Sequence, residues 1–206
     1  MRRARAITAL GIAAAFFAAG CPKQLPPPAP TPPPSPAPLP PTTAAACKRI
    51  TRIEVQKSQR KLTAECVDGG RLEYPIALAR ERGPKRTEGD SRMPEGDYQI
   101  AGPARISRFH RFIPFDYPSR ADAERALAEG RIDRATHDAV VEAQHHGRMP
   151  PQDTPLGGEL GIHGEGPRWR GDLDLNWTDG CVAVTDQAIE DLSRLVRRGT
   201  PVRIVP

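Results

Sequence analysis

Runs of alternating apolar and polar residues recur along most of the chain, and this pattern predicts β-strands. Residues 50–55 and 61–66 alternate on either side of a polar turn at 57–60, which is typical of an antiparallel hairpin. Residues 72–78 form a third run, in which Pro75 predicts an edge strand or a bulge because proline donates no backbone hydrogen bond. Further strands are predicted at 96–100, 160–163 and 202–205.

Three other segments carry the start and stop signals of helices. Ser119, Asp133 and Thr185 are expected N-caps, because their side-chain oxygens can accept hydrogen bonds from first-turn N–H groups. Gly130 and Gly147 follow the ends of the first two helices. The third helix has an apolar face at Ile189, Leu192 and Val196. Together with the strands, these signals predict a mostly-β domain with a few peripheral helices.

The N-terminal segment differs in composition from the rest of the chain. Basic residues at positions 2, 3 and 5 precede an apolar run that is shorter than the ~20 residues of a membrane-spanning helix, which predicts a secretory signal peptide over residues 1–20. The small residues before Cys21 resemble the lipobox of bacterial lipoproteins. This resemblance implies a lipid on Cys21 and, with Pro22 after it, an outer-membrane anchor. Ordinary signal cleavage beside an unmodified Cys21 is the alternative.

Residues 21–46 predict an extended tether. Twelve of the 24 prolines lie between Pro22 and Pro41. Because proline favours the polyproline II helix, at ~3.1 Å per residue, about 20 such residues could hold a domain ~60 Å from its anchor. A ligand for a proline-binding module is the less favoured alternative, since no repeated Arg or Lys flanks the prolines. The folded domain is expected at residues 47–206, exported to the cell envelope or periplasm.

The charge distribution argues against nucleic acid as a partner. The formal net charge is +5, but three of the basic residues lie in the leader, and the remainder is too nearly neutral to form a basic stripe. His137, His145 and His146 share one predicted helix, yet no Cys or carboxylate completes a tetrahedral metal site at their spacing. We interpret them as a solvated helix face and expect no metal or cofactor.

A histidine and a cysteine stand out because each adjoins a glycine in a predicted turn. His163 is followed by Gly164, and Gly180 precedes Cys181. Such a turn can expose the sulfur and direct backbone N–H groups toward one point, as an acyl-transfer oxyanion requires. A nearby imidazole would lower the thiol pKa from ~8.5 and supply a proton to a leaving amine. Spacing alone leaves open the alternative of a buried cysteine and a core histidine.

Three separated motifs resemble the L,D-transpeptidase family with the YkuD-type catalytic domain. The family signature is His-Gly followed by Ser/Thr-x-Gly-Cys, and this chain has His163-Gly164 and then Thr-Asp-Gly-Cys at 178–181. Residues 89–98 resemble the family's Gly-Asp-x-x-Thr-Pro-x-Gly-x-Tyr element, and 201–205 resemble its final strand. The resemblance covers about residues 48–206. It implies a β-sandwich-like fold with the catalytic cysteine at the mouth of a groove.

The resemblance also implies a role for each matching residue. Cys181 would be the nucleophile and His163 the general base and acid. The backbone carbonyl of Gly164 would orient the imidazole ring. The N–H groups of Gly180 and Cys181 would form the oxyanion hole, and Thr178 matches the Ser/Thr of the motif.

Other positions near the motifs bear on the substrate. Trp177 and Tyr98 are expected to contact it, with simple packing as the alternative for Trp177. Asp179 stands where the family often has His, and Ala183 where it often has Arg. We expect the Asp179 carboxylate mainly to orient or charge the His163 imidazole, with a solvated turn residue as the alternative. The absence of the Arg leaves the choice between transferase and hydrolase action open.

Cys47 and Cys66 are a candidate disulfide, because disulfides persist in exported proteins. A hairpin turn centred near residue 58 or 59 places Cys66 opposite residue 51 or 52, so a bridge requires the chain before Ile50 to fold back. This pairing would leave Cys181 as a free thiol, in agreement with a reactive role.

These interpretations together predict an exported, lipid-anchored L,D-transpeptidase. Its Cys181 would form a thioester with a peptidoglycan stem peptide, and a second amine would resolve the thioester into a cross-link or an attached protein. The alternatives are a hydrolase that resolves the same thioester with water, and a catalytically silent wall-binding module. The expected partners are stem peptides and, through the lipid on Cys21, the membrane.

The lipid anchor is testable through Cys21. We expect Cys21→Ser to move the protein from the membrane fraction to the soluble fraction, because the thiol that carries the lipid is lost. Cell fractionation combined with mass analysis of the mature N-terminus is the measurement. Wild-type protein that is already soluble and begins at a residue other than Cys21 would contradict the anchor.

Overall fold

The computed structural model describes residues 43–44, 46–166 and 176–206. The predicted signal peptide and nearly all of the predicted tether lie outside these ranges. All described residues fall within one compact unit, residues 38–206. Among them, no helix combines the length and the apolar character needed to cross a membrane.

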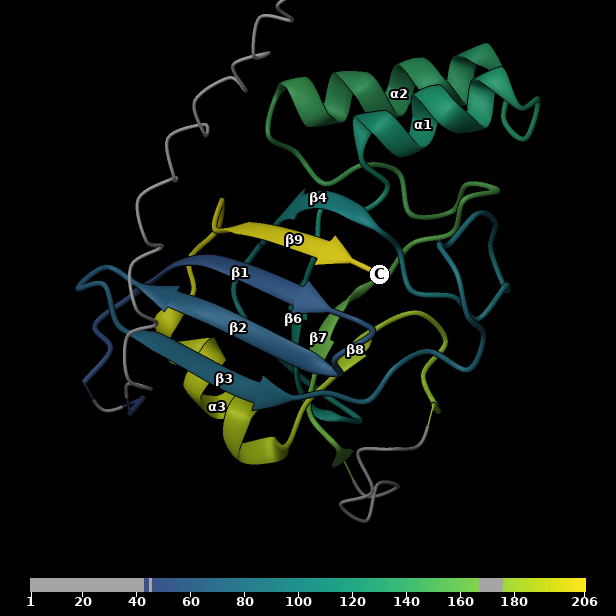
Figure 1. Ribbon diagram of the computed structural model, residues 1–206. Helices are drawn as coiled ribbons and strands as arrows, with labels where there is room; N and C mark the ends of the chain where they lie inside the picture. The colour runs from purple at the N-terminus through teal and green to yellow at the C-terminus, as the bar shows by residue number, and fades with distance from the viewer. Residues whose placement is uncertain (1–42, 45, 167–175) are drawn as a thin grey trace, which may run out of the picture. The chain divides into compact units, whose positions relative to one another are not determined.

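Five strands form the first sheet, which faces the viewer in Figure 1. In spatial order they are β3 (Arg71–Pro75), β2 (Lys61–Cys66), β1 (Ile50–Gln56), β9 (Pro201–Val205) and β4 (Gly96–Gln99). The predicted hairpin is confirmed, because β1 and β2 pair antiparallel as far as Gln56 and Lys61. Pro75 ends an edge strand, as predicted. The C-terminal strand β9 lies between β1 and β4, so both ends of the domain share one sheet.

Four shorter strands form the second sheet, behind the first in Figure 1. In spatial order they are β5 (Arg105–Ser107), β6 (His110–Pro114), β7 (Gly161–His163) and β8 (Val182–Ala183). The sequence pattern predicts only β7 among these. It does not reveal β6, because Phe112, Ile113 and Pro114 are buried in succession and lack the alternation of a half-exposed strand.

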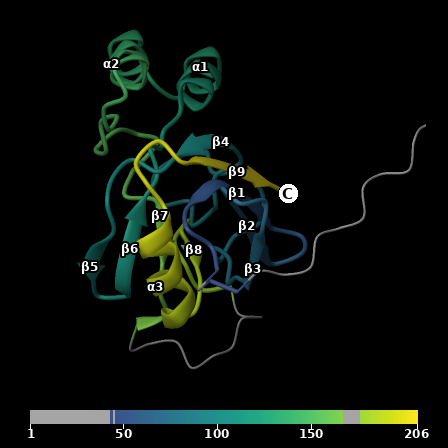
Figure 2. The same ribbon diagram turned by 90° about the vertical axis from the view of Figure 1, so that its left-hand side faces the viewer.

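The three predicted helices are confirmed with their N-caps. They are α1 (Arg120–Ala128), α2 (Arg134–His145) and α3 (Asp186–Leu195), and the capping side chains of Ser119, Asp133 and Thr185 accept first-turn N–H groups. Helices α1 and α2 pack on each other at one end of the two sheets, whereas α3 lies along the second sheet against β6 and β7 (Figure 2). The prediction of a mostly-β domain with peripheral helices is therefore correct.

One apolar core fills the space between the sheets. The first sheet contributes Ile53 and Leu62, the second contributes Ile113 and Ile162, and α3 contributes Ile189, each fully buried. Each such side chain stabilises the folded state by about 1.5–3 kcal/mol through the apolar surface it removes from water. Because β7 is buried in this core, the core packing also holds His163 at the end of the strand in place.

The chain that leaves β3 crosses from the first sheet to the second. Ala77 pairs antiparallel with Ala183 of β8, and Ala79 pairs parallel with Thr178. The amide of Arg80 donates to the carbonyl of Thr178 at 3.0 Å. This crossing brings residues 77–80 alongside the turn that carries Cys181, although about 100 residues separate the two segments.

Cys47 and Cys66 form a disulfide, with Cα atoms 5.6 Å apart. The register differs from the expected one, because Cys66 pairs with Ile50 and an irregularity between Ile50 and Arg52 adds one residue to β1. This shift shortens the distance that the chain before β1 must cover to reach Cys66. Both cysteines are buried in the core.

The absence of a side chain at Gly161 allows β7 to pair closely with β6. A Cβ atom at this position would lie 2.2 Å from the carbonyl oxygen of Ile113 and 2.8 Å from the ring of Phe112. We therefore expect Gly161→Ala to lower the free energy of unfolding by about 1–3 kcal/mol, because the paired strands must move apart.

Gly102→Ala is the matched control, because the nearest atom to its added Cβ is a side-chain carbon of Pro114 at 3.8 Å. We expect this variant to unfold close to wild type. Urea unfolding of both variants is the measurement, and equal midpoints for the two would contradict the proposed close contact at Gly161.

Candidate active site

Cys181 occupies a tight turn just before β8 and is half-buried. The hydroxyl of Thr178 donates to the carbonyl of Cys181 at 2.7 Å and accepts a long hydrogen bond of 3.4 Å from the amide of Gly180. The Thr178 side chain is only 3% exposed, so it acts inside the turn. The motif threonine thus sets the backbone geometry around the cysteine.

Gly180 is required by this turn. Its φ is +134°, which side chains rarely adopt, and a Cβ would lie 2.8 Å from the carbonyl oxygen of Arg92 and 3.0 Å from Leu160. The predicted oxyanion role of its amide stays a prediction, since that N–H faces Thr178 in the resting protein.

His163 lies at the end of β7 with its side chain 2% exposed. Its Nδ1 is 2.7 Å from the carbonyl oxygen of Gly164. Because a carbonyl can only accept, Nδ1 carries the proton and Nε2 of the neutral ring is left as a proton acceptor. This is the tautomer that a general base needs.

The loop after His163 is held from α3. The Asp186 carboxylate, in the first turn of that helix, accepts the amides of Glu165 at 2.8 Å and Gly166 at 3.3 Å. A Cβ on Gly164 would lie 2.5 Å from the same Asp186 oxygen, so only glycine fits. The helix therefore fixes the carbonyl that orients the imidazole.

Two aromatic rings frame the imidazole. Phe109 stacks on His163 with ring centroids 4.5 Å apart, and Trp177 meets His163 edge-on at 5.4 Å. Trp177 also contacts Phe109, at 5.5 Å. These contacts restrict rotation of the His163 ring and remove it from water.

A cavity of about 360 Å³ contains both reactive side chains. Its lining also includes Trp177, Thr178 and Asp179, so the structure brings these predicted site residues together. Sequence patterning did not indicate three charged residues of the lining, Arg80, Arg108 and Glu159. These residues lie outside the quoted motifs, and only long-range pairing brings them to the cavity. The predicted substrate contact of Trp177 stays a prediction, and the residue also packs on His163.

The prediction that Tyr98 contacts substrate is wrong. Its side chain is 3% exposed and belongs to the core between the sheets. The phenol donates to the Asp122 carboxylate of α1 at 3.0 Å. Tyr98 points inward from β4 because its position in the strand alternates with exposed Asp97 and Gln99.

The expectation that Asp179 acts on the imidazole is also not met. The Asp179 carboxylate pairs with Arg80 and accepts the hydroxyl of Ser91 at 3.0 Å. It is drawn to Arg80 because the crossing chain places that guanidinium beside the turn. The presence of alanine at position 183 also has a local reason, because this side chain is fully buried against Ala77. An arginine there would collide with the crossing chain.

Burial keeps the reactive pair neutral. Desolvation raises the pKa of Cys181 to about 11, and a backbone hydrogen bond from Gly161 and the charges of Lys85 and Arg108 only partly oppose this shift. Desolvation lowers the pKa of His163, and the charge of Arg108 lowers it further, against the hydrogen bond to Gly164. The thiol itself lies 3.7 Å from the carbonyl oxygen of Glu159. At neutral pH the resting site therefore contains a thiol and an uncharged imidazole.

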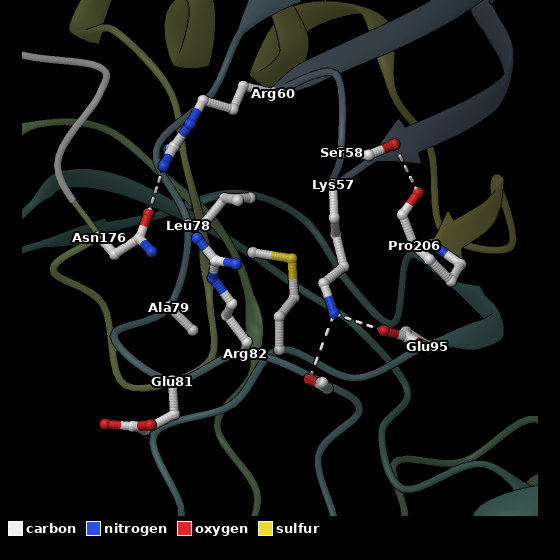
Figure 3. Close-up of a pocket in the computed structure, with 12 residues that line it drawn as sticks. Lys57, Ser58, Arg60, Leu78, Ala79, Glu81, Arg82, Glu95, Asn176 and Pro206 are labelled. Atoms are coloured by element: carbon white, nitrogen blue, oxygen red, sulfur yellow. Dashed lines mark hydrogen bonds and ion pairs between the residues drawn. The ribbon is translucent and has the colours of Figure 1, made fainter.

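A second cavity, of about 430 Å³, adjoins the turn between β1 and β2. There Lys57 bonds to the Glu95 carboxylate at 2.5 Å, and Arg60 bonds to the side-chain oxygen of Asn176 at 2.6 Å (Figure 3). Neither Cys181 nor His163 lines this cavity. We therefore assign the chemistry to the smaller cavity. Among the described residues, no group of three or more His, Cys, Asp or Glu side chains could hold a metal ion.

Comparison with known proteins agrees with the fold. Residues 50–204 match the YkuD family, described as the L,D-transpeptidase catalytic domain. The chain belongs to this family. A search of curated protein sequences gives no match.

Solved structures similar to this chain include the helical cell shape determining protein Pgp2 from Campylobacter jejuni, at 19% identity and a TM-score of 0.51, covering 75% of this chain and 47% of that one. Bd1075 from Bdellovibrio bacteriovorus matches at 20% identity and a TM-score of 0.47, with 79% and 49% covered. An Enterococcus faecium L,D-transpeptidase matches at 17% identity and a TM-score of 0.41, with 76% and 50% covered. This chain spans about half the length of these three proteins. The likeness to Pgp2 supports the fold alone.

The raised pKa of Cys181 predicts slow alkylation near neutral pH. With a thiol pKa of about 11, the thiolate fraction should rise roughly tenfold per pH unit from about pH 7 to about pH 10, whereas an ordinary thiol of pKa ~8.5 reaches its plateau near pH 9.5. The measurement is the rate of iodoacetamide addition to the peptide that contains Cys181. The same peptide in denaturant is the control, and an early plateau in the folded protein would contradict the burial effect.

Proposed function

We propose that this protein is an exported peptidoglycan L,D-transpeptidase that works through a Cys181 thioester. The observation that carries the proposal is the shared cavity of Cys181 and His163, with the imidazole held by Gly164 so that Nε2 is its proton acceptor. Membership of the YkuD family supports the reaction class. Two intact reactive side chains in one cavity favour an enzyme over a silent wall-binding module.

In the first half-reaction, the Cys181 sulfur attacks the amide carbonyl that follows the L-centre of the diamino acid in a stem peptide. The thiol proton passes to Nε2 of His163 as the carbon–sulfur bond forms. When the carbon–nitrogen bond breaks, the imidazolium returns this proton to the amine of the departing D-amino acid. The products are a thioester and a free D-amino acid.

In the second half-reaction, an amine from another stem peptide or from a protein attacks the thioester carbonyl. His163 accepts the proton that this amine loses and then returns it to the sulfur, so Cys181 is restored as a thiol. The developing oxyanion would be stabilised by the backbone N–H groups of Gly180 and Cys181. In a hydrolase, water would replace the amine with the same proton transfers.

The neutral resting state suits this sequence of proton transfers. Because the pKa of Cys181 is raised and that of His163 is lowered, the free protein does not store a charged pair in the buried site. Proton transfer therefore accompanies the attack on the carbonyl. The imidazolium exists only while the tetrahedral oxyanion is present to offset its charge.

We also propose that the protein acts from a lipid anchor at Cys21, with residues 21–46 as a tether between the anchor and the domain. The composition of residues 1–46 supports this arrangement. A stiff spacer suits an enzyme whose substrate lies at a set distance from a membrane, as peptidoglycan does.

Acylation by a carbapenem tests the nucleophile. We expect intact-mass analysis to show one adduct on wild type and none on Cys181→Ala, because the β-lactam carbonyl is attacked by this sulfur. His163→Ala should slow acylation by about 10²- to 10⁴-fold through loss of the base. His146→Ala removes an exposed histidine at the end of α2 and is the matched control. An adduct that survives in Cys181→Ala would place the reactive thiol elsewhere.

The same proteins incubated with tetrapeptide muropeptides separate the two outcomes of the thioester. Cross-linked products in the mass spectrum support the transpeptidase. Trimmed tripeptides without cross-links would assign the protein to the hydrolases, and no product from wild type would refute both.

A further inference from the structure

The cavity that contains Cys181 and His163 is lined by one cationic side chain, Arg108, that pairs with neither carboxylate of the lining. The Asp179 carboxylate pairs with Arg80, and the Glu159 carboxylate pairs with Arg105 at 2.5 Å. Arg108 is the remaining charged side chain in the lining. Within the part of the chain that the structure describes, no carboxylate forms an ion pair with it.

Arg108 is positioned by the aromatic frame of the site. Its guanidinium carbon lies 4.8 Å from the centre of the Phe109 ring, and that ring stacks on His163 at 4.5 Å. A cation over an aromatic face is attracted to it, so the contact holds the guanidinium against Phe109, the ring that also packs on the imidazole. Its charge acts on both reactive groups, because it lowers the pKa of His163 and opposes the rise in that of Cys181.

The chemistry of the proposed reaction places a carboxylate near this position. His163 must come within about 3 Å of the amine nitrogen that it protonates. In the departing D-amino acid, the carboxyl carbon is only two bonds from that nitrogen. A planar guanidinium can bind both oxygens of such a carboxylate through two parallel hydrogen bonds.

We propose that Arg108 forms a carboxylate subsite of the catalytic cavity, which binds the donor stem peptide through the free carboxylate of its terminal D-amino acid. This inference rests on the proposed function for the identity of the substrate. It makes Arg108 a substrate-binding residue that selects peptides with a free terminus and orients the leaving group toward His163. Arg80 and Arg105 do not share this role, because each is already held by an acid.

Peptide binding to the Cys181→Ala protein tests the subsite without any turnover. The probes are a synthetic stem tetrapeptide with a free C-terminus, the same peptide with a C-terminal amide, and a third with the diamino-acid side-chain carboxylate amidated. Calorimetry gives the Kd of each. We expect the C-terminal amide to bind about tenfold more weakly than the free acid, as the loss of a partly exposed charge-assisted contact predicts.

Adding Arg108→Gln should remove this difference, whereas Arg108→Lys should restore part of it by keeping the charge. Arg111→Gln is the matched control, because Arg111 lies in the same hairpin but pairs with Glu190 of α3. It removes one positive charge outside the cavity and should leave the tenfold preference intact. Thermal unfolding of each variant checks that the substituted arginines are not needed for folding.

Equal binding of free acid and amide, or a preference that persists in Arg108→Gln, would overturn the subsite. So would a failure of the free acid to bind at all. If the side-chain amide carries the penalty and Arg108→Gln abolishes it, the proposal is likewise overturned, because Arg108 then binds the diamino acid and not the terminal carboxylate. The proposed function fails separately, through a wild-type protein that forms no thioester adduct while these binding differences remain measurable.

Discussion

The crossing of the chain from the first sheet to the second is the constraint on which the site depends. Two pairings, Ala77 with Ala183 and Ala79 with Thr178, join segments about 100 residues apart. They explain why residue 183 is small and why Asp179 faces Arg80. They also place residues 77–80 alongside the turn that carries Cys181. The motif at residues 178–181 therefore takes its geometry from residues 77–80, a segment that lies outside the quoted motifs.

Burial has opposite consequences for folding and for chemistry in this domain. The apolar packing that holds β7 and the imidazole in place also raises the pKa of the Cys181 thiol and lowers that of His163. Cys181 and His163 are uncharged at rest, and among the described residues Arg108 is the one cation in the cavity lining without an ion pair. In the proposed mechanism, reactivity would therefore depend on a bound substrate that brings its own dipoles and charges.

Features that depend on neighbouring residues could be predicted from the sequence, whereas features that depend on long-range pairing could not. Helix caps such as Thr185 and the hairpin between β1 and β2 depend on neighbouring residues, so the pattern alone revealed them. The turn glycines at 164 and 180 likewise pointed to His163 and Cys181, whose side chains line one cavity. Strand β6 lacks alternation because Phe112, Ile113 and Pro114 are buried in succession, and Tyr98 sits in a family motif yet faces the core. Arg108 and Arg80 carry no signal of their own.

The disulfide between Cys47 and Cys66 has a mechanical consequence. A pulling force applied from the N-terminal side enters the domain at Cys47 and passes through the covalent bond directly to the end of β2. The enclosed hairpin is therefore bypassed by this load, and β1, which lies between β2 and β9 in the sheet, is not pulled out by residues that precede it. Tension along the chain would instead reach the loop between β2 and β3.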